Sequence, residues 1–304
     1  MSLLLTAAMV LALGGQDRGP PATPDPDAAN RLADVVISGE SLKSQTEAFV
    51  AQLAAPPERR GLARWAGRVC VGAVNIRPDI AQAVIDRVSE LALDLHLRIG
   101  DPGCTPNVVV IFTENAPALA DAMVEHDPAA FHLGVGGLDR GRAALQTFRT
   151  SDAPVRWWHV SMPVIGASGQ RAIRMPGDSE PIYVPGEGIV NRGRPISDNL
   201  NKVIIVLDVS KLGDVTLPQL TDYVGMVAMA QIDPEGETAA FDTVMNLFED
   251  PQGTPGLSDW DALYLQALYN GPRERVNPDA QAADIARILR RASRAQERAE
   301  RVTP

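Results

Sequence analysis

The chain has 304 residues, of which 45% are hydrophobic and 22% are charged. A chain of this length and composition buries a sizeable core, in one large domain or two small ones. Its 28 basic and 38 acidic residues give a formal net charge of −10. Because binding along a nucleic-acid backbone needs a basic surface, this balance argues against a nucleic-acid partner.

The N-terminus carries an apolar run over residues 3–13, followed by two glycines and a polar stretch. Such a run is too short to cross a bilayer, which takes about 20 residues. It is typical of the hydrophobic region of a signal peptide. We therefore expect residues 1–15 to be a signal peptide, the protein to be periplasmic or secreted, and no transmembrane span to remain after processing. The alternative is a buried N-terminal helix.

The chain has two cysteines, Cys70 and Cys104. Cys70 lies in a predicted strand, and Cys104 lies in a turn just before another predicted strand. Two cysteines in an exported chain most simply form one disulfide, so we expect Cys70 and Cys104 to be bonded. The alternative is a pair of buried thiols in a cytosolic protein. Without a nearby cluster of histidines, two cysteines do not make a structural zinc site.

Residues 16–59 are predicted to be a linker rich in proline, followed by a short helix over 40–54. From there to residue 271 we expect a single core domain. It begins with a strand around Cys70, a helix over 78–97 and a strand over 107–113. This order predicts a βαβ unit with a right-handed crossover.

The rest of the core domain continues the alternation and then becomes helical. A helix over 117–131, a glycine-rich loop over 133–141, a strand over 155–166, a long excursion over 167–201 and a strand over 202–210 precede helices over 217–232, 238–248, 258–269 and 278–300. We expect an α+β fold with a mixed β-sheet, packed helices and a helical C-terminal half. Residues 202–210 should form a central strand, and the helix over 217–232 should be buried, because it is apolar on nearly every side.

Charge is unevenly distributed near the C-terminus. Residues 205–262 contain 11 acidic residues and one basic residue, whereas residues 272–304 contain eight arginines and five acidic residues. We predict a basic amphipathic helix in residues 272–304. It either packs across the acidic half of the chain or stays solvated, where it would touch a partner or anionic lipid.

Few residues show a pattern that carries chemistry. The histidines are His96, His126, His132 and His159, and no two have the i, i+4 spacing of a helical zinc site. His126 and His132 flank the end of one predicted helix, but a metal site there would need a third ligand. The chain has no GxSxG nucleophile motif and no phosphate-binding loop. We therefore expect no catalytic residue, no metal ligand and no cofactor.

Two later segments resemble the core of the zincin metalloproteases, especially the metzincins. These proteases carry HExxHxxGxxH on a central buried helix and a later helix of the type seen here in LSDWDALYLQALY. Aligned with that motif, Asp222, Met226 and Ile232 take the positions of the three histidines. Tyr223 takes the position of the glutamate, and Met229 takes that of the glycine. The resemblance implies a zincin-like fold in which every zinc ligand and the general base are replaced.

Residues 60–270 also resemble a group of uncharacterised exported bacterial proteins. The shared features are a Trp…Cys…Cys-x-Pro-Asn opening and a DYVxMVAxAQ helix, found here at residues 222–231. This resemblance implies kinship and an exported protein, and it says nothing about activity.

Two functions are compatible with these features. The first is a non-catalytic binding or envelope-associated protein on a protease-like scaffold, with an unknown protein or envelope component as its partner. The alternative is a hydrolase of unrecognised class that uses a cleft near Asp222, Tyr223 and His159. An enzyme would bring several ionisable groups together in a concave pocket, whereas a binding protein would show a surface without that convergence.

Overall fold

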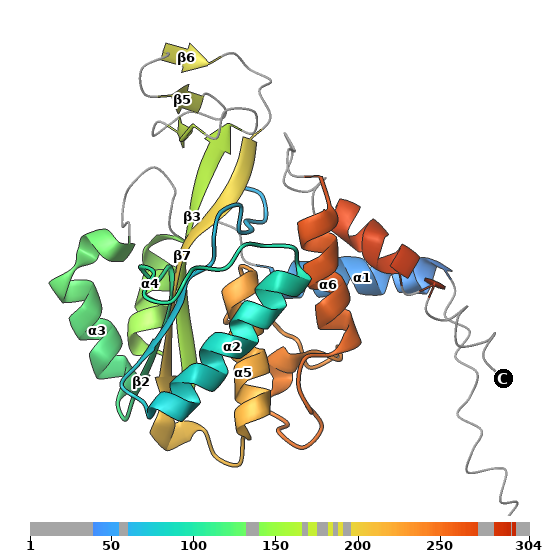
Figure 1. Cartoon of the computed structure of the whole chain (residues 1–304). Helices are drawn as coiled ribbons and strands as arrows, with labels where there is room; N and C mark the ends of the chain where they lie inside the picture. Colours follow the sequence, from blue (N-terminus) through green and yellow to red (C-terminus); the bar gives the residue numbers. More distant parts are fainter. Residues whose placement is uncertain are drawn as a thin grey trace, which may run out of the picture. The chain divides into compact units, whose positions relative to one another are not determined.

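A four-stranded mixed sheet runs through the centre of the fold (Figure 1). The computed structural model describes residues 39–54, 60–131, 140–165, 170–174, 182–184, 188–190, 196–272, 283–292, 294 and 295. The strands are β1 (Val71–Val74), β2 (Val108–Thr113), β3 (Val155–Ile165) and β7 (Ile196–Asp208), in the spatial order β1-β2-β7-β3. β1, β2 and β7 are parallel and β3 is antiparallel to β7. The predicted α+β fold with a mixed sheet is confirmed.

Helices surround this sheet. They are α1 (Gly39–Leu53), α2 (Pro78–Asp94), α3 (Ala116–His126), α4 (Gly141–Thr150), α5 (Leu217–Met229) and α6 (Asp259–Asn270). Short 3-10 turns occur at η1 (Pro128–Phe131), η2 (Val209–Lys211) and η3 (Val244–Asn246). Three further strands, β4 (Ile173–Arg174), β5 (Ile182–Val184) and β6 (Gly188–Val190), form a separate small sheet. The predicted signal peptide and most of the predicted linker lie outside the described residues.

The predicted βαβ unit is formed by β1, α2 and β2. Val71 of β1 lies opposite Val108 of β2 in a parallel ladder, and α2 connects the two strands. Pro78 begins α2, where its missing N–H group and its fixed backbone angle are tolerated. The apolar residues Val84, Val88 and Leu91 recur at helical spacing and are buried. Helical periodicity therefore predicted α2 correctly, although the helix ends at Asp94 and not at residue 97.

The strand predicted over 202–210 is central, as expected. β7 lies between β2 and β3, and it begins earlier, at Ile196. Its run Val203–Val206 is buried on both faces of the sheet, as apolar β-branched residues in an interior strand usually are. The helix expected after β7 is also present: α5 begins after a capping box made by Thr216 and Gln219.

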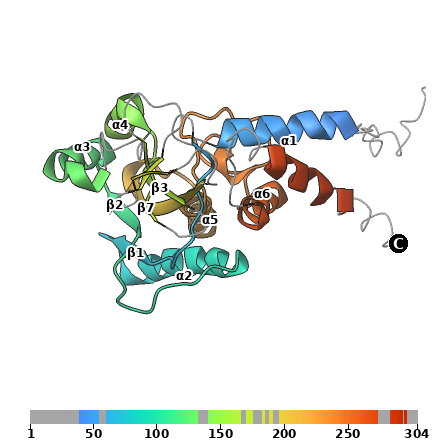
Figure 2. The same ribbon diagram turned by 90° about the horizontal axis from the view of Figure 1, so that it is seen from above.

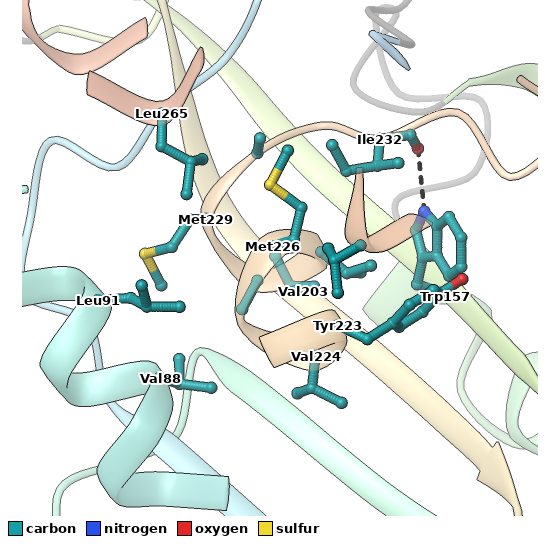
Figure 3. Packing of buried hydrophobic residues seen from close by; sticks show 14 of the residues in the cluster. Val88, Leu91, Trp157, Val203, Tyr223, Val224, Met226, Met229, Ile232 and Leu265 are labelled. Carbon is teal, nitrogen blue, oxygen red and sulfur yellow. Dashed lines mark hydrogen bonds between the residues drawn. The ribbon is translucent and has the colours of Figure 1, made fainter. Parts of the chain in front are cut away.

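α5 is buried between the sheet and α2. Met226 has no exposed surface, and Val224 and Met229 are equally buried (Figure 3). Gly225 makes the close approach to α2 possible, because a Cβ atom there would lie 2.3 Å from Cδ1 of Leu91. The helix ends at Met229, so Ile232 follows it in the chain and is not on it.

The two faces of the sheet have separate hydrophobic clusters. α2 and α5 cover one face, and α3 and α4 cover the other (Figure 2). The larger cluster, on the first face, also includes Phe49 of α1 and Leu265 of α6. The smaller cluster is centred on Phe131, Phe148 and Trp158, whose rings are tilted against one another.

The prediction of a helix over residues 238–248 is wrong. That segment forms turns and η3. Its polar side chains bond elsewhere: the Thr243 hydroxyl donates to Oδ1 of Asp261 at 2.6 Å, and the Val244 N–H donates to Oδ2 of Asp261 at 2.7 Å. Such side-chain bonds compete with the helical ladder, which explains why the helical pattern failed here.

Other predicted elements are partly correct. The helix over 117–131 is α3 followed by η1, and the excursion over 167–201 contains β4, β5, β6 and the start of β7. Most of the predicted loop over 133–141, including His132 before it, lies outside the described residues. Residues 283–292 are helical within the predicted range 278–300. Ile285 and Leu289 of this helix are buried in the larger cluster, so their side chains pack against the core of the fold.

Among the described residues, no helix combines the length and the apolar character that a membrane span requires. The predicted disulfide is present: Cys70 and Cys104 are bonded and tie the start of β1 to the turn before β2.

Replacing Cys70 and Cys104 together by serine should lower the free energy of unfolding by about 3–4 kcal/mol, because the bond closes a loop with a sequence separation of 34. Urea unfolding of the oxidised protein and of the variant measures the difference. Thiol titration of the denatured, non-reduced protein should detect no free thiol. Two free thiols per chain would refute the bond.

A candidate binding pocket at the edge of the sheet

A pocket of about 360 Å³ lies beside β3, the edge strand of the central sheet. One wall is formed by α4 and the loop that joins it to β3. The opposite wall is formed by residues 233–238 and 245–249, which follow α5 in the chain. The first residues of β3 and Tyr223 of α5 complete the lining. Its volume is at the lower end of the range for small-ligand sites.

Two tryptophans fix β3 at this pocket. Because side chains alternate along a strand, Trp157 enters the larger cluster and Trp158 enters the smaller one. Nε1 of Trp157 donates to the carbonyl oxygen of Ile232 at 3.0 Å (Figure 3). Nε1 of Trp158 donates to the carbonyl oxygen of Phe131 at 3.1 Å. Both indoles therefore anchor the strand, and both tryptophan residues line the pocket.

Tyr223 lines the pocket with a buried phenol. Its ring packs edge-on against Trp157 (Figure 3), with centroids 6.1 Å apart. It also packs edge-on against Phe248, with centroids 5.1 Å apart. The residue is 5% exposed, and its hydroxyl has no hydrogen-bond partner among the described residues. Burial raises the pKa of Tyr223 far above its ordinary value, and the charge of Glu249 raises it further. The phenol is therefore neutral and can donate one hydrogen bond to a ligand.

Arg156 lines the pocket next to the end of α4. Its guanidinium donates to the carbonyl oxygens of Phe148 at 3.1 Å, Arg149 at 3.3 Å and Ser151 at 2.5 Å. These bonds satisfy the free carbonyl groups at the C-terminus of α4, where a positive charge is also favourable. Burial lowers the pKa of Arg156, although Asp208 and Asp152 oppose this shift. Arg156 thus holds the wall of the pocket in place.

The rim of the pocket is acidic. Arg140 is paired with Asp233, with 3.0 Å between Nη2 of Arg140 and Oδ1 of Asp233. The Thr147 hydroxyl donates to Oε1 of Glu235 at 3.4 Å. Glu249 is exposed and forms no ion pair with any described residue. Carboxylates thus outnumber the cations that could neutralise them at this rim.

The backbone of β3 presents unpaired groups to the pocket. The N–H of Asp208 donates to the carbonyl oxygen of Pro154 at 2.8 Å, so these opposite residues form a hydrogen-bonded pair. In an antiparallel ladder such pairs alternate, so Arg156 and Trp158 also bond to β7. The backbone groups of Val155 and Trp157 point the other way, toward the pocket, and these two residues are 3% and 6% exposed. They have no backbone partner among the described residues.

The stretch of β3 whose outward backbone groups lack a strand partner is short. Farther along β3, the N–H of Ala172 donates to the carbonyl oxygen of Pro163, and the N–H of Ile165 donates to the carbonyl oxygen of Gln170. These bonds close the far end of the strand. The unpaired stretch that lines the pocket is therefore confined to the beginning of β3.

His159 does not line the pocket. It is 2% exposed, and its Nε2 donates to the carbonyl oxygen of Val227 in α5 at 2.8 Å. Burial lowers the pKa of His159 to about 4, and the nearby charge of Arg140 lowers it as well. The imidazole is neutral at physiological pH, where it holds β3 against α5.

Asp222 is also engaged elsewhere. Its Oδ1 accepts from Nε of Arg87 in α2 at 2.5 Å, and its Oδ2 accepts from the N–H of Leu257 at 2.8 Å. Of the three residues predicted to surround a cleft, Asp222, Tyr223 and His159, the pocket is thus lined by Tyr223 alone. The side chains of the other two bond to separate parts of the protein. His96 and His126 are exposed.

Four of the five positions aligned with the zincin motif lie on α5, and Ile232 follows this helix in the chain. Met226 and Ile232 have no exposed surface and belong to the larger cluster (Figure 3). No group of three or more His, Cys, Asp or Glu side chains suited to hold a metal ion occurs within the described ranges.

Comparison with protein-family models, with curated proteins and with solved structures finds no match. The zincin-like fold inferred from the resemblance is therefore not confirmed.

Sequence reasoning missed the pocket. Glu249 and Arg156 come from segments that are far apart in the chain. One signal was present: the run VRWWHV predicts a strand that carries two large aromatic residues. Strand order, which decides that this strand lies at an edge, is not a local property of the sequence.

Stability should fall in mild acid because of His159. Its pKa is 6.5 in the unfolded chain and about 4 in the fold, so the unfolded state takes up a proton first as the pH falls. The contribution of neutral His159 to the free energy of unfolding is complete above about pH 6.5. It is lost as the pH falls toward about 4, and the loss reaches up to about 3 kcal/mol. Urea unfolding from pH 7 to pH 4 measures this loss. His159→Gln should flatten that part of the profile, and parallel profiles for the two proteins would refute the role of His159.

Proposed function

We propose that this protein is a non-catalytic, exported binding protein, and that its binding site is the pocket beside β3. The observation that carries the proposal is the hydroxyl of Tyr223, which lines the pocket without a partner among the described residues. This hydroxyl is not one of the fully buried side-chain atoms that lack a partner, so it is open to the pocket and can donate to water or to a ligand. A ligand with a hydrogen-bond acceptor can take the place of that water, so the pocket suits a polar group.

The titration of the nearby groups supports binding over catalysis. General acid–base catalysis needs a group whose pKa lies near the working pH. Burial moves the pKa of Tyr223 upward and that of His159 downward, away from neutrality in both cases. His159 and Asp222 are also held by Val227 and Arg87, outside the pocket.

The disulfide supports the exported location. Such bonds persist in oxidising compartments, which include the periplasm and the extracellular medium. Cys70 and Cys104 pair in the structure and leave no free cysteine among the described residues. The partner is accordingly a protein or another component of the cell envelope.

Blocking the pocket tests this proposal. Thr147 of α4 lines the pocket, so Thr147→Trp should fill part of it. Thr105 is exposed and directly follows Cys104, and Thr105→Trp is the matched control. Saturation-transfer NMR with a defined mixture of small phenols, amides and capped dipeptides should show transfer to at least one probe. The signal should persist in Thr105→Trp and disappear in Thr147→Trp.

Two results would overturn the proposal. One is transfer that is unchanged by Thr147→Trp in a variant whose thermal unfolding matches the wild type. The other is turnover of casein or of a p-nitrophenyl ester by the wild type, because the site would then be catalytic. Stoichiometric zinc that is lost together with such an activity would identify a metallohydrolase.

A further inference from the structure

We infer that the ligand of this pocket is an extended peptide of a partner protein, which adds a short strand to β3 and places a basic side chain beside Glu249. This inference rests on the proposed function, because it names the class of partner that the same pocket takes. Three features of the lining support it: the outward backbone of β3, the hydroxyl of Tyr223 and the exposed carboxylate of Glu249 at the rim.

The backbone of β3 offers the pattern that a peptide strand needs. Val155 and Trp157 each direct one N–H donor and one carbonyl acceptor away from β7, and both residues line the pocket. A small ligand rarely matches donors and acceptors that alternate at this spacing. A peptide in extended conformation matches them automatically, since its own backbone has the same period.

The size of the opening limits the length of the added strand. Val155 and Trp157 are two positions apart, which corresponds to about 7 Å along a strand. The far end of β3 is closed by Ala172, which bonds to Pro163. A segment of about three to five residues therefore fills the open stretch.

The charge of the rim selects a basic side chain. Glu249 is exposed, contributes its charge to the surroundings of Tyr223 and forms no ion pair with a described residue. Glu235 lies on the same rim, whereas Arg140 is already paired with Asp233. A lysine or arginine beside Glu249 would gain a partner, and the net charge of −10 favours the approach of a basic segment.

The walls of the pocket favour a peptide over a second copy of this chain. Edge-to-edge pairing of two folded sheets needs an edge that stands clear of its surroundings. Here α4 lies on one side of the open stretch, and residues 233–238 and 245–249 lie on the other. A single extended chain fits between such walls more readily than the edge of another folded sheet.

Backbone methylation of a defined peptide tests the strand. The probe is a fluorescein-labelled Thr-Val-Lys-Val-Thr amide, titrated with the wild-type protein by fluorescence anisotropy. Two analogues carry N-methyl groups, one on the odd and one on the even residues. Only one set of amides in an added strand faces β3, so one analogue should bind at least about tenfold more weakly and the other should keep its affinity.

Protein variants test the charge. Glu249→Gln should weaken binding of the lysine peptide by about threefold, and a peptide with norleucine in place of lysine should lose this difference. Asp94 is the matched control, because it is exposed on α2, which packs against the opposite edge strand β1. Asp94→Asn should leave the affinity unchanged.

The outcomes separate this inference from the proposed function. If both methylated analogues bind like the parent peptide, or if small probes bind but no peptide does, strand addition is refuted and the pocket remains a binding site. If Thr147→Trp leaves peptide binding intact, the pocket itself is refuted. A dimer detected by light scattering, in which the amides of Val155 and Trp157 are protected without peptide, would show that a second copy occupies the edge.

Discussion

Met226→Asp should destabilise the protein by about 4 kcal/mol or more, because it would bury an unpaired carboxylate in the larger cluster. Met226 has no exposed surface and lies on α5 between the sheet and α6, with Val203 and Leu265 nearby (Figure 3). α5 has no room to rotate this side chain outward, since its neighbours Tyr223 and Met229 are buried as well. Urea unfolding followed by circular dichroism measures the loss.

Met226→Leu is the control for this prediction. It keeps the apolar character and nearly the volume of the side chain, so it should cost less than about 1.5 kcal/mol. Equal stability of Met226→Asp and the wild type would show that α5 is exposed and would refute the packing described here.

Asp198→Ala should cost about 3–5 kcal/mol, because it would remove the carboxylate that pairs with the buried guanidinium of Arg60. The side chains of Arg60 and Asp198 are 5% and 8% exposed. Oδ1 of Asp198 accepts from Nε of Arg60 at 2.6 Å, and its Oδ2 accepts from the N–H of Gly61 at 2.8 Å. Arg60 also donates to the carbonyl oxygen of Ser161, so this pair joins the chain before β1 to both β7 and β3.

An exposed ion pair provides the comparison. The side chains of Arg77 and Asp79 are 74% and 61% exposed, so Asp79→Ala should leave the free energy of unfolding nearly unchanged. The double variant Arg60→Met, Asp198→Leu should recover most of the stability lost in Asp198→Ala, because it removes both buried charges. Equal unfolding energies for Asp198→Ala and Asp79→Ala would refute the buried role of the pair.

Local patterns predicted the elements whose burial follows from their own sequence. The β-branched run of β7, the helical spacing of Val84, Val88 and Leu91, and the all-round apolar character of α5 each correspond to the observed element. In these segments the periodicity and the tertiary environment agree, so a short window of sequence is sufficient.

Local sequence patterns failed where contacts with distant residues determine the structure of a segment. Asp261 bonds to Thr243 and Val244 and holds that segment in turns, although the segment reads as a helix. The sequence offered both His159 and Tyr223 as candidate site residues. The hydrogen bond from His159 to Val227, which the sequence does not reveal, shows that His159 faces the core. The pocket depends on the place of β3 at the sheet edge, which arises from the pairing order of four strands.

Residue-resolved hydrogen exchange of the β3 amides tests the central claim most directly. In the free protein, the N–H groups of Arg156 and Trp158 should exchange slowly because they bond to β7, and those of Val155 and Trp157 should exchange faster. Addition of the lysine peptide should selectively slow exchange at Val155 and Trp157. Peptide binding that leaves these two amides unchanged, or that protects all four equally, would contradict strand addition at the edge of the sheet.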